Sequence, residues 1–322
     1  MQIQHKTAYQ FSFRYHNQKF TQPVITNHGI WETRESIIIC LMDINHQIAW
    51  GEIAPISWFG SETIEQALEF CQQLPGKITD EIIFTIPDHL PSCQFGFESG
   101  YENLMHQNPT ITNLTYSGLL SAGEKALNQW QTLWEQGYQT FKWKIGVDDI
   151  AKELKIFNSL IHDLPNSAKL RLDANGGLNY ETTKLWLQTC DQLQTKIEFI
   201  EQPLPINQFH EILKLSKSYS TKIALDESVA TLQQLKNCYQ QGWRGIFVIK
   251  PGIVGSPSQL RKFCQQNQID KVFSSVFETE IGRQASLKLA AELSLNHRAV
   301  GFGVNHFFTQ QQNWLQTLWN NL

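Results

Sequence analysis

From about residue 113 onward, short apolar runs alternate with amphipathic helical patterns. Such alternation is typical of βαβ crossovers and predicts a parallel sheet. Eight units within about 200 residues favour a closed barrel over an open doubly wound sheet. The open sheet is also disfavoured because no Gly-rich dinucleotide-binding motif follows the first strand. The candidate strands cover residues 114–120, 140–145, 169–173, 197–201, 222–226, 245–250, 271–275 and 299–303.

The part of the chain before residue 113 has a different pattern. Two strand-like segments come first, and an amphipathic stretch then begins with Ser61 as its N-cap and ends at Pro75-Gly76. A second helical stretch covers about 88–107. We therefore predict an α+β module at residues 1–112 and a barrel at residues 113–305.

Five charged residues each close one of the apolar runs in the barrel. They are 24 to 29 residues apart, about one βα unit. In a parallel barrel these positions share the carboxyl-end rim, where barrel enzymes place their active sites. A single charged residue at a strand end is ordinarily a solvated loop residue, but five in register favour a common site. They are Lys144, Asp173, Glu201, Asp226 and Lys250.

The three carboxylates end neighbouring strands and would repel one another at close range. A divalent cation removes this repulsion, and ligands that offer only oxygen favour Mg²⁺ or Mn²⁺ over zinc. We therefore expect Asp173, Glu201 and Asp226 to be metal ligands. Side-chain alternation places Glu227 on the opposite face from Asp226, so Glu227 is kept only as an alternative ligand.

The two lysines that close strands two and six lie opposite each other in an eight-stranded barrel. Lys142 shares a strand face with Lys144, and two neighbouring ammonium groups lower each other's pKa. A lysine with a lowered pKa serves as a base near neutral pH. With a carboxylate substrate bound to the metal, this arrangement suggests abstraction of its α-proton and a stabilised enediolate.

Several runs of sequence resemble the muconate-lactonising subgroup of the enolase superfamily, and within it most closely the o-succinylbenzoate synthase family. The resemblance covers nearly the whole chain. The runs at the site are Lys142-Trp143-Lys144, Arg171-Leu172-Asp173-Ala174-Asn175, Glu201-Gln202-Pro203, Asp226-Glu227-Ser228 and Ile249-Lys250-Pro251. Supporting runs are Gly51-Glu52-Ile53-Ala54-Pro55-Ile56, Phe59-Gly60-Ser61-Glu62-Thr63 and Phe273-Ser274-Ser275 with Glu278.

This resemblance implies a modified (β/α)7β TIM-like barrel with an N-terminal α+β capping domain, which residues 306–322 rejoin. It implies Mg²⁺ bound by the three carboxylates and dehydration of 2-succinyl-6-hydroxy-2,4-cyclohexadiene-1-carboxylate, a step of menaquinone and phylloquinone biosynthesis. Lys144 would act as base and then acid, and Lys250 would stabilise the enediolate. The residues implied to hold the succinyl tail are Ser274, Ser275 and Gly301, and those implied to orient the metal ligands are Arg171 and Asn175.

The resemblance also implies a mobile loop over the site around His28 and Arg34, for which a solvated surface loop is the alternative. The nearest rival function is an N-succinylamino acid racemase, which also uses two opposed lysines. Dipeptide epimerases carry an Asp-x-Asp near the last strand, where this chain has Gly301-Phe302-Gly303-Val304-Asn305, which argues against substrates that bear an ammonium group. A non-catalytic metal-binding relative is the rival from another class.

Composition excludes other classes of function. The 322 residues carry a net charge of −4 and no basic stripe, which argues against a nucleic-acid partner. No apolar run approaches the roughly 20 residues of a membrane helix, and no secretory signal is visible. We expect a cytoplasmic enzyme for a small carboxylate, with its six scattered cysteines reduced. The oligomeric state stays open, and a monomer is compatible with the sequence.

Overall fold

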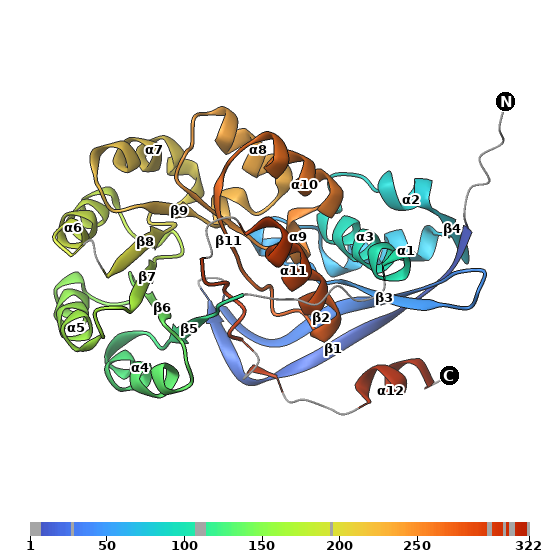
Figure 1. Ribbon diagram of the computed structural model, residues 1–322, viewed down its shortest axis with the longest axis horizontal. Coiled ribbons are helices and arrows are strands. Elements are labelled where there is room, and N and C mark those ends of the chain that lie inside the picture. Colours follow the sequence, from blue (N-terminus) through green and yellow to red (C-terminus); the bar gives the residue numbers. More distant parts are fainter. Residues whose placement is uncertain are drawn as a thin grey trace.

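The computed structural model describes residues 8–26, 29–106, 114–193, 196–294, 298–304, 307–308 and 313–320. These residues form a barrel and a smaller N-terminal sheet module that lies beside it (Figure 1). The boundary at residues 112 and 113 stays a prediction, because residues 107–113 lie outside the described ranges. No helix in the described part of the chain is long and apolar enough to cross a membrane.

In the described residues, seven parallel strands follow one another around the barrel in chain order. The predicted eighth strand, 299–303, is present only as two bridges, in which Val300 pairs with Tyr116 and Gly301 with Ser274. These bridges join the last strand to the first, so the predicted TIM-like fold is confirmed. The strands are β5 (Ser117–Leu120), β6 (Thr140–Lys144), β7 (Lys169–Asp173), β8 (Ile197–Glu201), β9 (Ile223–Leu225), β10 (Ile246–Ile249) and β11 (Asp270–Phe273).

Helices surround this ring of strands (Figure 1). They are α4 (Ala126–Glu135), α5 (Ile150–Asp163), α6 (Tyr180–Asp191), α7 (Phe209–Ser218), α8 (Leu232–Gln240), α9 (Pro251–Val254), α10 (Pro257–Gln266) and α11 (Glu280–Leu293). Short 3₁₀ turns lie between them: η2 (Gly123–Lys125), η3 (Ile206–Gln208) and η4 (Glu227–Val229).

Side-chain alternation along the strands separates two layers of the barrel. On β6, Phe141 and Trp143 point outward and are fully buried in the main core, where Trp143 and Phe157 both pack against Trp186. A second apolar cluster, made of Phe199, Ala224, Ile246, Val248 and Val272, packs between the strands. Because side chains fill the barrel, room for a ligand is left at the carboxyl-end rim.

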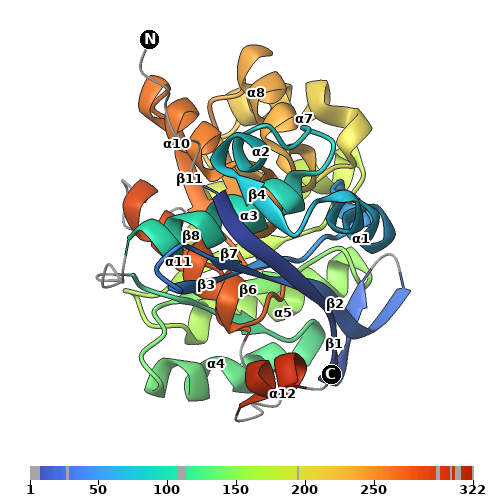
Figure 2. The same cartoon turned by 90° about the vertical axis from the view of Figure 1, so that its right-hand side faces the viewer.

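The N-terminal module is an antiparallel sheet in the order β3-β2-β1-β4, covered by helices. Two of the strands in this sheet are long (Figure 2). Its elements are β1 (Ala8–Thr26), β2 (Gly29–Met42), β3 (Ile48–Ile53), η1 (Ser57–Phe59), α1 (Ile64–Gln73), β4 (Lys77–Thr79), α2 (Asp80–Phe84) and α3 (Pro91–Met105).

The predicted N-cap of the first helix is wrong by two residues. Thr63 is the N-cap of α1, because its side chain accepts from the Gln66 N–H while the Gln66 side chain accepts from the Thr63 N–H. The Ser61 hydroxyl instead accepts the Ile56 N–H and shapes the preceding loop. The second predicted helix, 88–107, is confirmed as α3.

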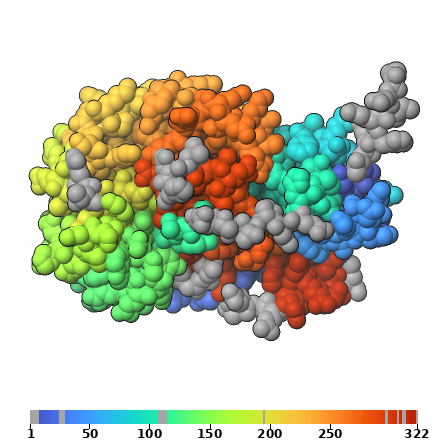
Figure 3. All heavy atoms as spheres, in the orientation of Figure 1, coloured from blue at the N-terminus to red at the C-terminus, as the bar shows by residue number. Residues whose placement is uncertain are grey.

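The C-terminal helix α12 (Trp314–Asn320) lies beside the N-terminal module rather than the barrel (Figure 3). The ring of Trp319 is 4.5 Å from that of Trp50, and the ring of Trp314 is 4.7 Å from that of His16. Arg14 lies over the Trp319 ring at 5.1 Å. All six cysteines are buried and unpaired, as the sequence predicts.

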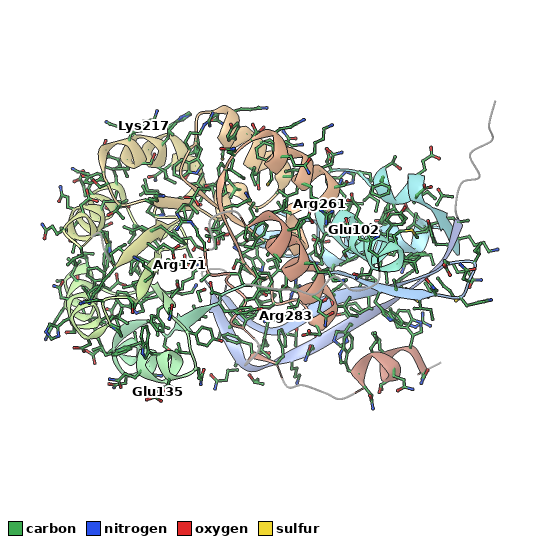
Figure 4. The ribbon with its side chains drawn as sticks, viewed as in Figure 1. Glu102, Glu135, Arg171, Lys217, Arg261 and Arg283 are labelled. Atoms are coloured by element: carbon green, nitrogen blue, oxygen red, sulfur yellow. The ribbon has the colours of Figure 1, made fainter. Side chains whose placement is uncertain are left out.

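Buried polar contacts fasten the module to the barrel. Glu52 of β3 accepts bonds from the Thr279 N–H at 3.0 Å, from the Thr279 hydroxyl and from the Gly282 N–H at 2.9 Å, and so caps the N-terminus of α11. Glu98 of α3 accepts from the Ser258 N–H at the start of α10. One turn further along, Glu102 pairs with Arg261 (Figure 4).

The contact at Glu52 gives a stability prediction. We expect Glu52→Ala to lower the free energy of unfolding by about 3 kcal/mol or more, because three buried donors lose a charged acceptor. Urea unfolding measures this loss. The exposed Glu32→Gln, on the neighbouring strand, is the control and should stay within about 0.5 kcal/mol of the wild type. An equal, small change in both variants contradicts the prediction.

Candidate active site

The strands bring the five rim residues together. Register places Lys144 beside Asp173 and Asp173 beside Glu201. Asp226 follows the last residue of β9, and Lys250 follows the last residue of β10. All three carboxylates are buried, at 2 to 3% exposed. The predicted grouping of the charged strand ends at one rim therefore matches the geometry.

Lysines pair with the carboxylates across the rim. The Lys142 Nζ donates to Glu201 Oε1 at 2.6 Å and lies 2.9 Å from Asp173 Oδ2. Lys250 forms an ion pair with Asp226, and its Nζ also lies 4.1 Å from the centre of the Phe59 ring. Each buried carboxylate thus has a cationic partner, as buried charges require.

This arrangement sets the direction of the pKa shifts. Burial raises the pKa of Glu201 to about 7; Lys142 opposes the rise, whereas Asp173 and Asp226 add to it. Burial alone would raise the pKa of Asp173, but Lys142 and Lys144 outweigh it and lower the pKa. Burial would lower the pKa of Lys142, but the carboxylates, Asp173 first, raise it. The lowered pKa expected for the lysine pair is therefore not what Lys142 has in this arrangement.

Asn175 occupies the centre of a second set of contacts. Its side-chain Oδ1 accepts from the Lys144 Nζ at 2.5 Å, and its Nδ2 donates to Glu227 Oε1 at 3.0 Å. Its backbone N–H donates to Asp173 Oδ1 at 3.1 Å. Asn175 has a φ of 44°, a left-handed conformation that asparagine tolerates better than most residues.

Glu227 was expected to face away from Asp226, and that expectation is wrong. The strand β9 ends at Leu225 and a 3₁₀ turn starts at Glu227, so strand alternation does not reach this residue. Both Asp226 and Glu227 line the same cavity. Burial raises the pKa of Glu227, and repulsion by Asp173 adds to the rise.

A cavity of about 220 Å³ opens above these residues. The barrel contributes its charged floor, and the N-terminal module contributes apolar walls. Its floor and sides include Lys142, Lys144, Asp173, Asn175, Asp226, Glu227, Lys250, Ser274, Ser275 and Gly301, and its walls include Val24, Trp31, Ile56, Trp58 and Phe59. Sequence periodicity does not predict that Trp31, Trp58 and Phe59 line the cavity, because they come from the other module.

The predicted substrate-binding residues line this cavity on the side where the barrel closes. The Gly301 N–H already donates to the Phe273 carbonyl at 2.8 Å, and its carbonyl accepts from the Ser275 N–H. The Ser275 hydroxyl donates to Glu278 at 2.8 Å. Within the described residues, the Ser274 hydroxyl has only a 3.4 Å contact with the Gly301 carbonyl, which leaves it the most available donor of the three residues.

Arg171 is not brought to the carboxylates, although it shares the strand face of Asp173. Its Nε donates to Glu198 Oε2 at 2.7 Å, and its guanidinium lies 4.9 Å from the centre of the Phe199 ring. Glu198 also pairs with Arg298, which binds Asp270. Arg171 therefore belongs to an ionic cluster lower in the barrel, and the prediction that it orients the metal ligands lacks a contact.

The predicted loop around His28 and Arg34 is only partly described, since His28 lies outside the described residues. Arg34 is 3% exposed within β2, which excludes a solvated position. Its guanidinium donates to the carbonyls of Ala54, Pro55, Glu35 and Val276. Burial lowers the pKa of Arg34 to about 10, which still leaves it charged at neutral pH.

The donor set suits a hard divalent cation, because Asp173, Glu201 and Asp226 offer only carboxylate oxygen. In the described residues no three such side chains are already arranged as a coordination shell. The ammonium groups of Lys142 and Lys250 occupy the space between the carboxylates instead. A cation held by the three carboxylates would take the place of these two ammonium groups.

Comparisons with known proteins agree with this geometry. A family model described as "Enolase C-terminal domain-like" matches residues 125–315, and one described as "MenC, N-terminal domain" matches residues 6–104. The barrel and its rim thus define a member of the enolase superfamily.

Two similar proteins show to which family of this superfamily the chain belongs. An o-succinylbenzoate synthase of Thermosynechococcus vestitus is 38% identical over 300 residues, 92% of this chain and 93% of that protein. A crystal structure of o-succinylbenzoate synthase from Thermosynechococcus elongatus BP-1, complexed with Mg in the active site, has a TM-score of 0.90 at 36% identity and covers 97% of this chain and 100% of that one. The chain belongs to the o-succinylbenzoate synthase family of enzymes.

The fold alone is shared more widely. The L-Ala-D/L-Glu epimerase of Bacillus subtilis has a TM-score of 0.76 at 20% identity and covers 93% of this chain and 90% of that one. The family resemblance seen in the sequence is therefore confirmed at both levels, superfamily and family.

Proposed function

We propose that this enzyme is an Mg²⁺-dependent dehydratase that converts 2-succinyl-6-hydroxy-2,4-cyclohexadiene-1-carboxylate to o-succinylbenzoate in menaquinone or phylloquinone biosynthesis. The single observation that carries the proposal is the rim itself: two lysines flank three buried carboxylates beneath a cavity of about 220 Å³. Family membership supports the substrate.

Asp173, Glu201 and Asp226 would hold the cation, with Mn²⁺ as an alternative to Mg²⁺. The bound cation would supply positive charge beside the substrate carboxylate, where negative charge develops during the reaction. The crystal structure of the relative from Thermosynechococcus elongatus BP-1, complexed with Mg in its active site, supports this part of the proposal.

The proton transfers would belong to Lys144. Its neutral amine takes the α-proton of the substrate, and the C–H electron pair moves into the carboxylate to give an enediolate. When this electron pair returns to the ring, the C–O bond to the hydroxyl breaks. Lys144 then gives its proton to the departing oxygen, so that water leaves and the ring becomes aromatic. The same group acts first as base and then as acid.

The other residues would stabilise the enediolate and position the substrate and Lys144. Lys250 approaches from the opposite side of the rim, where its charge stabilises the enediolate. Ser274, Ser275 and Gly301 would hold the succinyl tail, and the apolar walls would enclose the ring. Asn175 would orient Lys144, and Lys142 would balance the charge of the ligands.

The deciding experiment follows dehydration by ultraviolet absorbance with and without Mg²⁺, with racemisation of an N-succinylamino acid run in parallel. We expect fast, metal-dependent dehydration. Fast racemisation with little dehydration would instead identify an N-succinylamino acid racemase, which the opposed lysines also suit. No turnover in either assay would favour a non-catalytic metal-binding relative.

A location in the cytoplasm belongs to the same proposal, and the oligomeric state stays open, with a monomer compatible with the sequence. Six buried, unpaired cysteines suit a reducing compartment. The partner we propose is the small carboxylate substrate.

Gly301 gives a prediction about substrate affinity. A Cβ at this position would lie 2.7 Å from the Ser274 Oγ, so Gly301→Ala pushes the hydroxyl out of place. We expect KM to rise about tenfold, roughly 1.4 kcal/mol, with little change in kcat. Ser274→Ala should act similarly, and the double variant should be no worse than either single one. Additive losses would show that the two residues act separately.

A further inference from the structure

Glu227 has no role in the mechanism above, yet it is a partly buried carboxylate on the wall of the reaction cavity. Its Oε1 accepts from Asn175, and its Oε2 is buried without a hydrogen-bond partner among the residues that the structure describes. Such an incompletely paired carboxylate is costly to keep in a folded protein. Glu227 therefore calls for an explanation beyond packing.

The contacts of Asn175 supply one. An asparagine amide has an accepting oxygen on one side and a donating nitrogen on the other, and the two are nearly equal in shape. Lys144 lies on one side of this amide and Glu227 on the other. A carboxylate accepts and does not donate, so it holds the nitrogen on its own side and leaves the oxygen for the lysine.

The oxygen matters for the reaction because of what Lys144 must do. A hydrogen bond from Nζ to Oδ1, at 2.5 Å, fixes the direction of one N–H and thereby that of the remaining positions on the nitrogen. In the reversed orientation the amide nitrogen would face an ammonium group, donor against donor, and the amine would turn away.

The backbone holds both Asn175 and Glu227 in place. Asn175 has a φ of 44° and its N–H is bound to Asp173, so the side chain starts from a fixed point. Glu227 is the first residue of η4, and this turn is closed by a hydrogen bond from the Val229 N–H to the Asp226 carbonyl. Only the orientation of the amide is left to be decided by its neighbours.

We propose that Glu227 is a positioning residue for Lys144 that acts through the Asn175 amide, and that it is not a metal ligand. The proposal rests on the function given above, in which Lys144 is the base. Glu227 sets the direction of the amine, and the three carboxylates Asp173, Glu201 and Asp226 hold the cation without it.

The test compares Glu227→Met with Glu227→Gln in the full-length enzyme. Methionine fills the space without an acceptor, whereas glutamine keeps an oxygen for Asn175. We expect Glu227→Met to lower kcat about 100-fold with KM changed less than threefold, and Glu227→Gln to restore most of that loss. Asn175→Ala should resemble Glu227→Met, and the double variant should lose no more than either single one.

Affinity for Mg²⁺, measured by calorimetry without substrate, separates the roles. We expect it to be unchanged in Glu227→Met; a loss of tenfold or more would make Glu227 a ligand and overturn the proposal. Glu62→Gln is the control, because it changes a buried carboxylate that caps α3 and does not line the cavity. If Glu62→Gln and Glu227→Met reduce kcat equally, the effect is structural and the proposal is wrong.

The dehydration assay distinguishes a wrong positioning role for Glu227 from a wrong assignment of the enzyme's function. If the wild type dehydrates the substrate, Lys144→Ala does not, and Glu227→Met keeps its kcat, only the positioning role is wrong. If Lys144→Ala still turns over, the base is misassigned and the positioning role falls with it.

Discussion

Lys144→Ala should lower kcat for dehydration by at least about 100-fold, because general-base catalysis contributes roughly 10²–10⁴-fold. The loss should leave the fold intact, since Lys144 lies on the cavity side of β6 and its hydrogen bond is to Asn175 rather than to the core. Stopped-flow or steady-state ultraviolet absorbance measures kcat, and circular dichroism reports on folding.

The control for this variant is Lys152→Ala. Lys152 is exposed on α5, where it forms a 2.5 Å ion pair with Asp148 at the helix surface. Its loss should leave kcat unchanged. Dehydration by Lys144→Ala at more than about one hundredth of the wild-type rate contradicts the assignment of Lys144 as base.

Glu201→Gln should weaken Mg²⁺ binding at least about 100-fold and reduce turnover in parallel. Even residues that only orient a metal ligand contribute about 10–100-fold to affinity, so a ligand itself should contribute no less. Glutamine keeps the shape of the side chain but removes its charge and the ion pair with Lys142. Calorimetric titration with Mg²⁺ measures the affinity.

Glu198→Gln is the matched control, because Glu198 lies three residues earlier on the same strand and is bound to Arg171 and Arg298. It should lose stability and keep its affinity for Mg²⁺. Equal loss of affinity in both variants would mean that Glu201 acts through the barrel rather than as a ligand.

The barrel and the rim could be predicted because they follow from local pattern. Each strand is an apolar run closed by one charged residue, and parallel register then brings those residues to one edge, as with Lys144, Asp173 and Glu201. Spacing along the chain is enough for this inference.

Other features depend on how far along its strand a residue lies and on where the strand gives way to a turn, and sequence periodicity does not encode either. Arg171 shares the correct face but lies two residues below Asp173, about 6–7 Å along the strand, and so reaches Glu198 instead. Glu227 lies beyond a strand of only three residues, where alternation no longer applies. The contacts of Phe59 and Trp31 with the cavity depend on how the two modules dock.

Arg34 has a consequence for protein engineering. Its guanidinium ties together β2, the loop before η1 and the loop after β11, through carbonyls rather than through side chains that substitution could remove. Trp31, Ile56 and Val276, which line the cavity, are neighbours of these tied points. The three segments therefore form one transplantable unit: a new substrate range obtained by grafting requires all three together with the arginine. Exchange of a single loop for one of different backbone conformation would move these carbonyls away and leave the buried guanidinium without its acceptors.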